Sequence, residues 1–501
     1  MTTDVTTHTD VTTHTDVLIA GAGPTGLVLA VDLARRGIPH RLVERADRGF
    51  PGSRGAGLQP RSLEVFEDLG VLEAMRAAGG PCPPLMLWDG DRQTGEWDII
   101  LRAEPTPAVP YGEIMMLPQW RTVEILAARL EELGGRVEFE TELTGFEQDA
   151  DGVTATLTRP DGATEAVRAP YLVGADGGRS AVRRALGVGF ASEPVDERAA
   201  LLADVVVDGL ERTHWHVWPD APGGRFMLRP LEGVETFQLV ARHDDSDTRV
   251  DPERDGTTEA LQRLIEEQTG RSDLKVGEVH WVSAFKPRMA MAERFREGRV
   301  FLAGDAAHVH SPAGGQGLNT SIQDGYNLGW KLDAVLRRGA PDTLLDTYAT
   351  ERMKIAADVL GMSTRIHHED DAGRPRRGAE TLQLHVGYPD SDLTRELRHD
   401  LPEDALRAGD RAPDAPCEDP ATGARVRLFE VFQGPHATVL ALGDAEFTVP
   451  EWVRVFRPVD VDGHVKDAYR SGYFVIRPDG YVGLATDDAG DVAAYLAALS
   501  G

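Results

Sequence analysis

The sequence predicts an α/β protein whose main domain is interrupted by a smaller antiparallel domain and followed by a third domain. Three observations predict this arrangement. A short apolar strand passes through a glycine-rich turn into a helix at residues 17–37. Two further strand-to-helix junctions follow at 171–183 and 299–330. Between these two junctions, short strand-like runs are typical of an antiparallel sheet. The 501 residues have room for about two to four domains.

The composition is that of a globular protein, with 41% hydrophobic and 27% charged residues. Lys and Arg number 53 against 82 Asp and Glu, so the formal net charge is −29. A surface of that sign repels phosphate backbones and anionic membranes, and nucleic acid and membrane partners are therefore not expected. Cys82 and Cys417 form no metal or redox motif. We expect a soluble cytoplasmic protein, either a monomer or a homodimer.

The N-terminal segment, residues 1–15, repeats Thr, His, Asp and Val without a basic start or an apolar stretch. It is therefore not a secretory signal. Its histidines could suggest metal binding, but the composition favours a disordered tail.

The first motif follows the apolar strand at 17–20 and has the pattern G-x-G-x-x-G. In this turn Gly21 permits a tight bend, Gly23 lets a pyrophosphate approach the backbone, and Gly26 lets helix and strand pack closely. The helix N-terminus offers free N–H groups to phosphates. Glu44 lies about 20 residues further on and can accept a hydrogen bond from a ribose hydroxyl. The unit predicts binding of FAD or NAD and disfavours a 2′-phosphate at this position.

Two further motifs each place an aspartate where a strand passes into a helix. Asp176 follows the apolar run 171–174, and Asp305 follows 300–303 ahead of a loop rich in proline and glycine. Such junctions lie at the carboxyl ends of strands, where open α/β sheets bind ligands. Asp305 can accept a hydrogen bond from a polyol, and the helix that begins near Gly317 can direct its positive end at a group that gains negative charge. Alternatively, the two aspartates cap helices.

With these motifs in order, the chain resembles the FAD-dependent aromatic hydroxylases built like p-hydroxybenzoate hydroxylase. Within that family the resemblance is closest to the bacterial enzymes that modify aromatic polyketides. It covers most of residues 16–360 and includes two smaller matches, at 53–55 and 117–119. The resemblance implies an α/β FAD-binding domain, a variant of the glutathione-reductase-like Rossmann fold, with an inserted antiparallel substrate domain. The implied divisions are an FAD-binding domain at 16–189 and 283–366, a substrate domain at 190–282, a linker at 367–404 and a thioredoxin-like domain at 405–501.

The resemblance also assigns roles to single residues. Asp305 would bind the ribityl chain or pyrophosphate of FAD, and Asp176 belongs to a motif that the family links to FAD and to the nicotinamide cofactor. The backbone of 317–319 would face the pyrimidine edge of the flavin, and Pro312 would lie near its reactive carbon. The residues expected to contact FAD are Gly21, Gly23, Gly26, Glu44, Arg45, Arg54, Gln119, Asp176, Asp305, Gly317, Leu318 and Asn319.

The family implies a flavin monooxygenase that uses NADPH or NADH and dioxygen. No second G-x-G-x-x-G site is present, so the nicotinamide cofactor is expected to bind transiently. A flavin C4a-hydroperoxide would hydroxylate a polycyclic aromatic polyketide in antibiotic biosynthesis. The alternatives are a Baeyer–Villiger or epoxidising enzyme, a flavin dehydrogenase that oxygenates nothing, and an FAD-binding protein without turnover. The motifs do not separate them because they contact the cofactor and not the substrate.

The middle segment supplies the candidate substrate pocket. Trp215, Phe226, Met227, Phe237 and Phe285 are candidates to line a pocket for a flat aromatic molecule, and the alternative for each is a place in the core. Two histidine pairs, 214 with 216 and 308 with 310, each share one strand face. Neither pair has a third ligand at a suitable spacing, so no metal site is predicted. No side chain identifies itself as a catalytic base, and a surface or structural role is the expectation for every histidine.

The C-terminal part begins after helical patterns over 331–366. From about residue 405, strand patterns and a turn at 478–480 precede a final helix. This part resembles the thioredoxin-like domain of the polyketide and phenol hydroxylases. It lacks Cys-x-x-Cys, so a structural role is expected and thiol chemistry is not.

Overall fold

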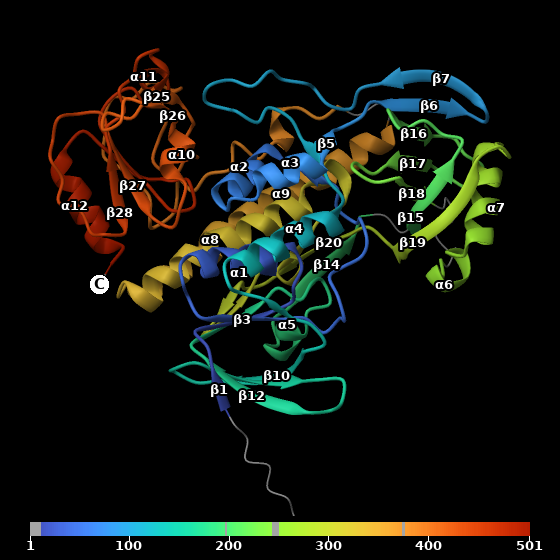
Figure 1. Cartoon of the computed structure of the whole chain (residues 1–501), viewed down its shortest axis with the longest axis horizontal. Helices are drawn as coiled ribbons and strands as arrows, with labels where there is room; N and C mark the ends of the chain where they lie inside the picture. The colour runs from blue at the N-terminus through green and yellow to red at the C-terminus, as the bar shows by residue number, and fades with distance from the viewer. Residues whose placement is uncertain (1–11, 196–197, 243–249, 373–375, 501) are drawn as a thin grey trace, which may run out of the picture.

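The computed structural model describes residues 12–195, 198–242, 250–372 and 376–500. A central α/β unit lies between a seven-stranded sheet at one end of the molecule and a smaller α/β unit at the other (Figure 1). The predicted α/β class with an inserted antiparallel sheet is confirmed. No helix in the described part of the chain has the length and apolar character needed to cross a membrane.

The central sheet brings the three sequence motifs together. Its strands, in spatial order, are β21 (Arg296–Glu297), β22 (Val300–Leu302), β13 (Tyr171–Gly174), β2 (Val17–Ala20), β3 (His40–Val43) and β9 (Val137–Glu138). All pairings are parallel except that of β21 with β22. Because β22, β13 and β2 are adjacent and parallel, the loops after them meet at one edge of the sheet. The glycine turn, Asp176 and Asp305 all lie on these loops.

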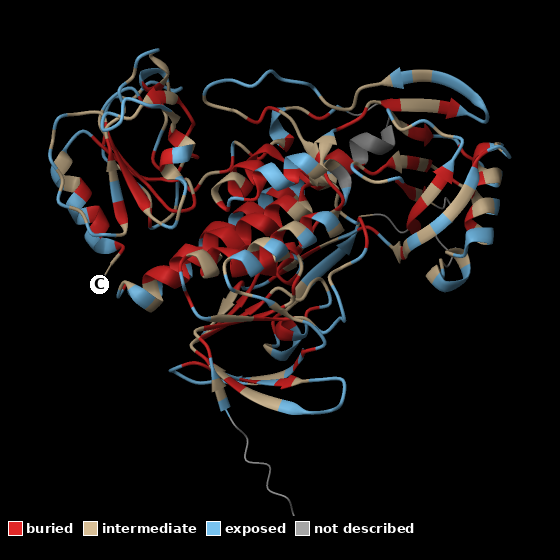
Figure 2. Ribbon diagram, in the orientation of Figure 1, coloured by how far each residue is buried: buried red, intermediate tan, exposed pale blue. Residues whose placement is uncertain are grey.

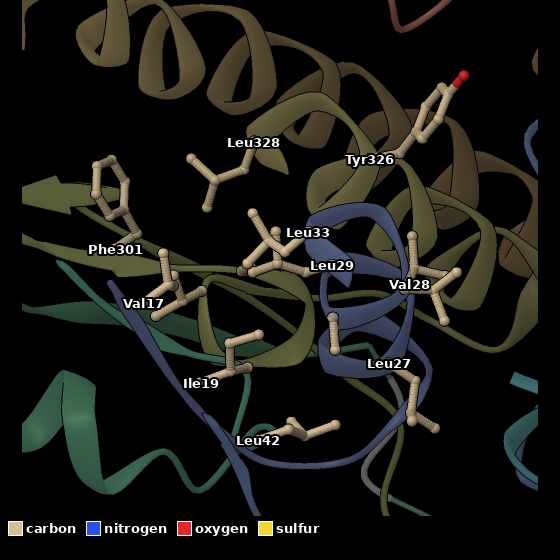
Figure 3. Packing of buried hydrophobic residues seen from close by; sticks show 14 of the residues in the cluster. Val17, Ile19, Leu27, Val28, Leu29, Leu33, Leu42, Phe301, Tyr326 and Leu328 are labelled. Carbon is tan, nitrogen blue, oxygen red and sulfur yellow. The ribbon is translucent and has the colours of Figure 1, made fainter. Parts of the chain in front are cut away.

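The core of this unit lies between the sheet and two helices. Helix α1 (Pro24–Arg35) covers the sheet and packs against α8 (Gly317–Arg337). Figure 3 shows Val17 and Ile19 of the sheet facing Leu29 of α1, and all three are fully buried. The two helices approach so closely that a Cβ at Gly329 would lie 2.2 Å from a carboxylate oxygen of α1.

Helix α8 is buried over most of its length. Figure 2 shows it buried along most of its length, and every residue of 319–334 is buried. Polar side chains in this stretch therefore need partners inside the protein. Further helices and short strands complete the unit. They are α2 (Pro60–Asp68), α3 (Leu72–Ala78), α4 (Gln119–Glu132), α5 (Ala181–Ala185), α9 (Asp346–Ala372), β4 (Gly57–Leu58), β5 (Gly80–Pro81), β8 (Met115–Met116), β14 (Phe190–Pro194), β20 (Arg288–Ala292) and β23 (His308–Val309).

A second, four-stranded sheet includes the end of the segment that was expected to be disordered. Its order is β1 (Thr12–His14), β12 (Thr164–Ala169), β11 (Val153–Thr158) and β10 (Glu142–Gln148). The disordered tail predicted for 1–15 is wrong at its end, because β1 pairs with β12 and the Thr13 hydroxyl donates to Glu165 at 2.6 Å. Residues 1–11 lie outside the described residues.

The seven-stranded sheet includes strands outside the residue range expected for the substrate domain. Its order is β19 (Lys275–Phe285), β15 (Ala200–Asp208), β18 (Thr236–Arg242), β17 (Phe226–Pro230), β16 (Trp215–Trp218), β6 (Leu85–Asp89) and β7 (Arg92–Trp97). The range 190–282 is therefore incomplete, because the hairpin of β6 and β7 joins the sheet through parallel pairing of β16 with β6. Helices α6 (Pro252–Asp255) and α7 (Thr258–Thr269) contact this sheet through β19.

The C-terminal unit contains a five-stranded sheet. One of its strands lies inside the range expected to be a linker. The sheet order is β24 (Arg395–Glu396), β30 (Val482–Thr486), β29 (Tyr473–Ile476), β27 (Ala437–Ala441) and β28 (Val453–Phe456), with α10 (Leu428–Phe432), α11 (His464–Tyr469), α12 (Ala489–Ala498), β25 (Pro416–Glu418) and β26 (Arg425–Arg427) around it. The linker predicted at 367–404 is wrong at both ends. Helix α9 continues to Ala372 because residues 362–372 contain neither glycine nor proline, and β24 pairs with β30.

Candidate active site

A cavity of about 2550 Å³ opens where the three motif loops meet. Its walls come from these loops, from the N-terminus of α8 and from strands of the seven-stranded sheet. Typical pockets for a single small ligand measure about 300–1,000 Å³, so this cavity has room for a large cofactor together with a second molecule.

The glycine turn shows which glycines the protein itself requires. Gly21 has φ +105°, and a Cβ there would lie 2.4 Å from the carbonyl oxygen of Ala175. A Cβ at Gly26 would lie 2.0 Å from the carbonyl oxygen of Gly21. Gly23 differs, since a Cβ at that position meets nothing within 4 Å, and it lines the cavity. The packing of the chain therefore explains Gly21 and Gly26, and a ligand that approaches the backbone explains Gly23.

Glu44 stands at the end of β3 beside this turn. Its carboxylate accepts hydrogen bonds from the backbone N–H groups of Ala22 and Ala46, each at 3.0 Å. These bonds hold the acid at the cavity wall, next to the exposed Arg45. The arrangement suits an acceptor for a ribose hydroxyl.

The two motif aspartates occupy different environments. One oxygen of Asp176 accepts from the N–H groups of Ala181 and Val182 at the start of α5, at 2.7 and 3.2 Å, so the capping alternative is correct for that oxygen. The other oxygen is buried and has no partner in the described part of the chain. Asp305 does not cap by its carboxylate, which is exposed and lines the cavity. Enclosure by the cavity walls raises the pKa of Asp305, although the positive charges of His308 and Arg54 act against this.

The remaining predicted FAD contacts fall into two groups. Gln119 accepts from the N–H of Gly55 at 3.0 Å, and Arg54 donates to Ser283 at 2.9 Å; both predicted residues line the cavity. Asn319 is fully buried instead, and its amide donates to the carbonyl oxygen of Gly315 at 2.7 Å. It shapes the loop whose neighbours Gly317, Leu318 and Pro312 reach the cavity.

These residues fit a flavin dinucleotide. Two helices, α1 and α8, begin at the cavity and direct their free N–H groups toward it. The unpartnered oxygen of Asp176 and the exposed carboxylate of Asp305 supply acceptors for ligand hydroxyls. The open space at Gly23 admits a pyrophosphate.

Only some of the predicted substrate residues reach the cavity. Trp215, Met227 and Phe285 line it. The prediction is wrong for Phe226 and Phe237, which are 0% and 1% exposed and belong to a hydrophobic cluster with residues of α7. Successive side chains of a strand point to opposite faces, so Phe226 and Met227 cannot both face the cavity.

Sequence reasoning missed two polar residues on the cavity face. Arg229 and Gln238 line the cavity and hydrogen-bond to each other, and the Gln238 amide donates to the carbonyl oxygen of Ser53. A period-two count from Met227 would have found Arg229. Sequence reasoning also missed that His308 and His310 hydrogen-bond to each other and that His310 lines the cavity.

The fold and the cavity are those of a flavoprotein. The model of the FAD binding domain family matches residues 14–363, and the chain belongs to that family. It is 44% identical over 487 residues to a flavin-dependent monooxygenase of Mycobacteroides abscessus, which covers 96% of this chain and 99% of that protein. It is 35% identical over 494 residues to the 12-dehydrotetracycline 5-monooxygenase/anhydrotetracycline 6-monooxygenase of Streptomyces rimosus, covering 93% and 94%.

A solved structure agrees with these relatives. The ternary complex of aklavinone-11 hydroxylase with FAD and aklavinone superposes with a TM-score of 0.78 at 30% identity, over 97% of this chain and 99% of that one. The predicted family, the flavoprotein fold and the predicted FAD-dependent monooxygenase activity are confirmed.

Proposed function

We propose that this enzyme hydroxylates a polycyclic aromatic polyketide, with NADPH or NADH as the electron donor. One observation carries the proposal. A single cavity connects the motif loops around Asp305 with the face of the sheet that bears Trp215 and Met227. The aromatic and sulfur side chains suit a flat ring system. Relatives named for 12-dehydrotetracycline, anhydrotetracycline and aklavinone support the same substrate class.

The residues of the cavity have distinct tasks in this proposal. Bound FAD supplies the oxygen chemistry, and the protein binds, orients and excludes water. Gly23, Glu44 and Asp305 hold the dinucleotide. The start of α8 near Gly317 stabilises negative charge on the flavin ring. Cys82 and Cys417 are buried free thiols, which supports a reducing cytoplasmic compartment.

The test is turnover by the purified yellow protein. NADPH or NADH is added under air with a set of tricyclic and tetracyclic phenols. We expect one phenol to stimulate oxidation of the nicotinamide and to yield a product heavier by one oxygen with its carbon rings unchanged. A lactone product would favour the Baeyer–Villiger alternative. Nicotinamide oxidation with no oxygenated product would favour a dehydrogenase and contradict the proposal.

A further inference from the structure

Helix α8 begins after a loop in which two successive glycines have a left-handed backbone. Gly314 has φ +76° and Gly315 has φ +64°, and both line the cavity. Amide side chains hold the carbonyl oxygens of this loop. Gln316 donates to the carbonyl of Gly314 at 2.7 Å, and Asn319 donates to that of Gly315 at 2.7 Å. The path of the loop, and with it the direction of the first N–H groups of α8, therefore depends on these side chains.

Gln316 connects this loop to the interior of the protein. Its side chain is fully buried, and its NH₂ group also donates to the carbonyl oxygen of Thr381 at 3.0 Å. Both acceptors of the NH₂ group are backbone carbonyls, so the amide has a defined orientation and its oxygen needs a donor. That donor is the side-chain amide of Gln383, at 2.8 Å.

Gln383 makes three hydrogen bonds to one face of α8. It lies between α9 and β24 and is 1% exposed. Its NH₂ group donates to Gln316 and also to the hydroxyl of Thr320 at 3.1 Å. Its oxygen accepts from the amide of Gln323 at 2.6 Å. The partners are spaced by four and three residues, which places them on the same face of the helix.

The backbone of Gln383 has a conformation that its residue type does not favour. Its φ is +60°, in the left-handed region where residues other than glycine are uncommon. Such a conformation costs free energy and persists where the surrounding structure holds it. Since the amide of Gln383 is bonded to three residues of α8, these contacts supply the constraint.

We propose that Gln383 is a positioning residue for the flavin ring. It holds Gln316, and through it the glycine loop, so that the first N–H groups of α8 stabilise the negative charge that the ring gains on reduction. The inference rests on the role proposed above for the start of α8. Gln383 acts through Gln316, which lines the cavity. The range 367–404, predicted as a linker, thereby takes part in the chemistry of the cofactor.

The first test measures the two-electron midpoint potential of bound FAD, by slow anaerobic reduction beside a reference dye and without any aromatic substrate. Gln383→Ala removes the amide and keeps the left-handed backbone. We expect the preference of the protein for reduced over oxidised FAD to fall about tenfold, which equals a fall of about 30 mV. A merely structural residue would lower the free energy of unfolding without moving the potential. An unchanged potential in Gln383→Ala would therefore overturn the proposal.

A second variant separates the amide from the backbone. Gln383→Gly also removes the amide, but glycine adopts this φ without strain. We expect the same fall in potential as in Gln383→Ala, together with a smaller loss of free energy of unfolding. A wild-type potential in Gln383→Gly would overturn the role of the amide. Asp400 is exposed and has φ +52°, so Asp400→Gly is the matched control and should leave the potential unchanged.

A third variant decides the question if neither substitution of Gln383 retains FAD. Thr320→Val removes one acceptor of the Gln383 amide and keeps the shape of the side chain. We expect a smaller change in the same direction, of about threefold in the preference for reduced FAD. An unchanged potential in Thr320→Val would then count against the proposal.

The outcomes separate this inference from the proposed function. The potential is measured without a phenol, so a wild-type protein that hydroxylates nothing contradicts the proposed function and leaves the role of Gln383 standing. Normal hydroxylation with an unchanged potential in Gln383→Ala contradicts the inference alone. A wild-type potential equal to that of free FAD in the same buffer would show that the start of α8 does not stabilise the reduced ring, and would overturn the inference.

Discussion

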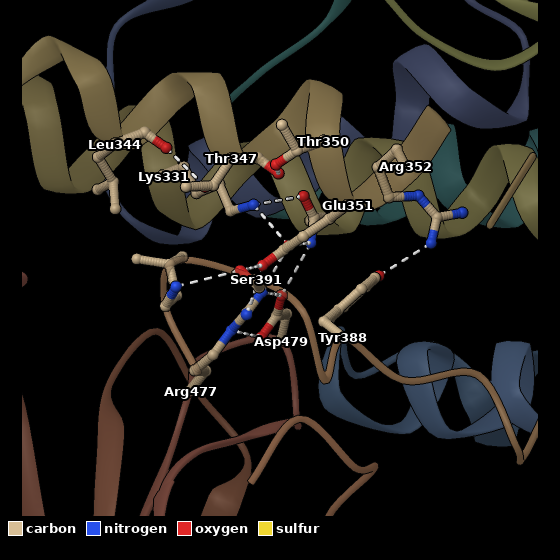
Figure 4. Close-up of polar contacts among 12 residues, drawn as sticks. Lys331, Leu344, Thr347, Thr350, Glu351, Arg352, Tyr388, Ser391, Arg477 and Asp479 are labelled. Atoms are coloured by element: carbon tan, nitrogen blue, oxygen red, sulfur yellow. Dashed lines mark hydrogen bonds and ion pairs between the residues drawn. The ribbon is translucent and has the colours of Figure 1, made fainter. Parts of the chain in front are cut away.

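Helix α8 carries two buried polar clusters that differ in how completely they are satisfied. The interface cluster, Lys331, Glu351, Arg477 and Asp479, joins α8 and α9 to the C-terminal unit (Figure 4). Lys331 donates to Glu351 at 2.7 Å, and Arg477 donates to Glu351 at 2.7 Å and to Asp479 at 2.6 Å. Both oxygens of each carboxylate accept at least one hydrogen bond.

The cavity cluster, Asp324, His308 and His310, starts from an equally well-paired carboxylate. It ends on Nδ1 of His310, which has no hydrogen-bond partner among the described residues. One oxygen of Asp176 is likewise buried and without a hydrogen-bond partner in the described part of the chain. Buried polar groups are almost always paired in folded proteins. The interface cluster therefore fastens the C-terminal unit to α8 and α9, whereas the cavity cluster leaves one buried nitrogen unpaired among the described residues.

We expect the largest effect from a substitution that breaks the interface cluster. Glu351→Ala leaves the buried charges of Lys331 and Arg477 without their shared partner and should lower the free energy of unfolding by about 3–5 kcal/mol. Denaturant unfolding at a fixed FAD concentration measures this loss. Lys354 lies on the same helix as Glu351 and forms an exposed ion pair with Asp390, so Lys354→Ala should leave the free energy of unfolding nearly unchanged. Equal effects of the two substitutions would contradict the role of the interface cluster.

The next prediction concerns the pH dependence of stability that a buried acid, Asp204, produces. Burial raises the pKa of Asp204 to about 6, although hydrogen bonds from Ser53 and the positive charge of Arg229 oppose it. Between pH of about 4 and 6 the folded state keeps a proton that the unfolded state has lost, so this group's contribution to stability falls as pH rises. Asp204→Asn removes that dependence and should gain about 2–3 kcal/mol relative to the wild type between pH 4 and pH 7.

Unfolding midpoints at several pH values measure this difference. Asp208→Asn, at the exposed end of the same strand, is the matched control and should show no such trend. A constant difference between Asp204→Asn and the wild type across this range would show that Asp204 ionises normally.

We expect the smallest effect from a substitution of Asp305, the acceptor that lines the cavity. Asp305→Ala removes a charged acceptor for FAD and should weaken its binding by about 1.5–3 kcal/mol, or roughly 10- to 150-fold. Titration of flavin fluorescence on the apoprotein gives the Kd. The exposed Asp151→Ala should leave this Kd unchanged. A normal flavin content in purified Asp305→Ala would count against the assigned role.

Local chemistry made the motif loops predictable. Gly21 requires a positive φ, and Gly26 requires contact with the turn that precedes it, so both constraints lie within a few residues. The helix start at Gly317 and the capping by Asp176 are equally local. These features follow from neighbours in the chain and can be inferred from residue type and spacing.

Features that depend on distant partners could not be inferred in this way. The hairpin of β6 and β7 joins the seven-stranded sheet only through its pairing with β16, a strand far along the chain. Phe226 and Met227 are both plausible pocket residues in the sequence, and only the packing of the sheet decides which one faces the cavity. Residues 12–14 continue the repeat of Thr, His, Asp and Val in the N-terminal segment, and only pairing with the edge of β12 makes them a strand.

The sequence by itself determined the three motifs, their order along the chain and therefore the family and the cofactor. The tertiary structure alone decided that His310 ends a chain of hydrogen bonds anchored on Asp324 and that Arg477 closes a cluster on α8. The reason is physical: a turn is specified by the dihedral angles of adjacent residues, whereas a buried polar network depends on atoms brought together from separate elements. His308 meets Asp324 across 16 residues, and Glu351 meets Arg477 across 126.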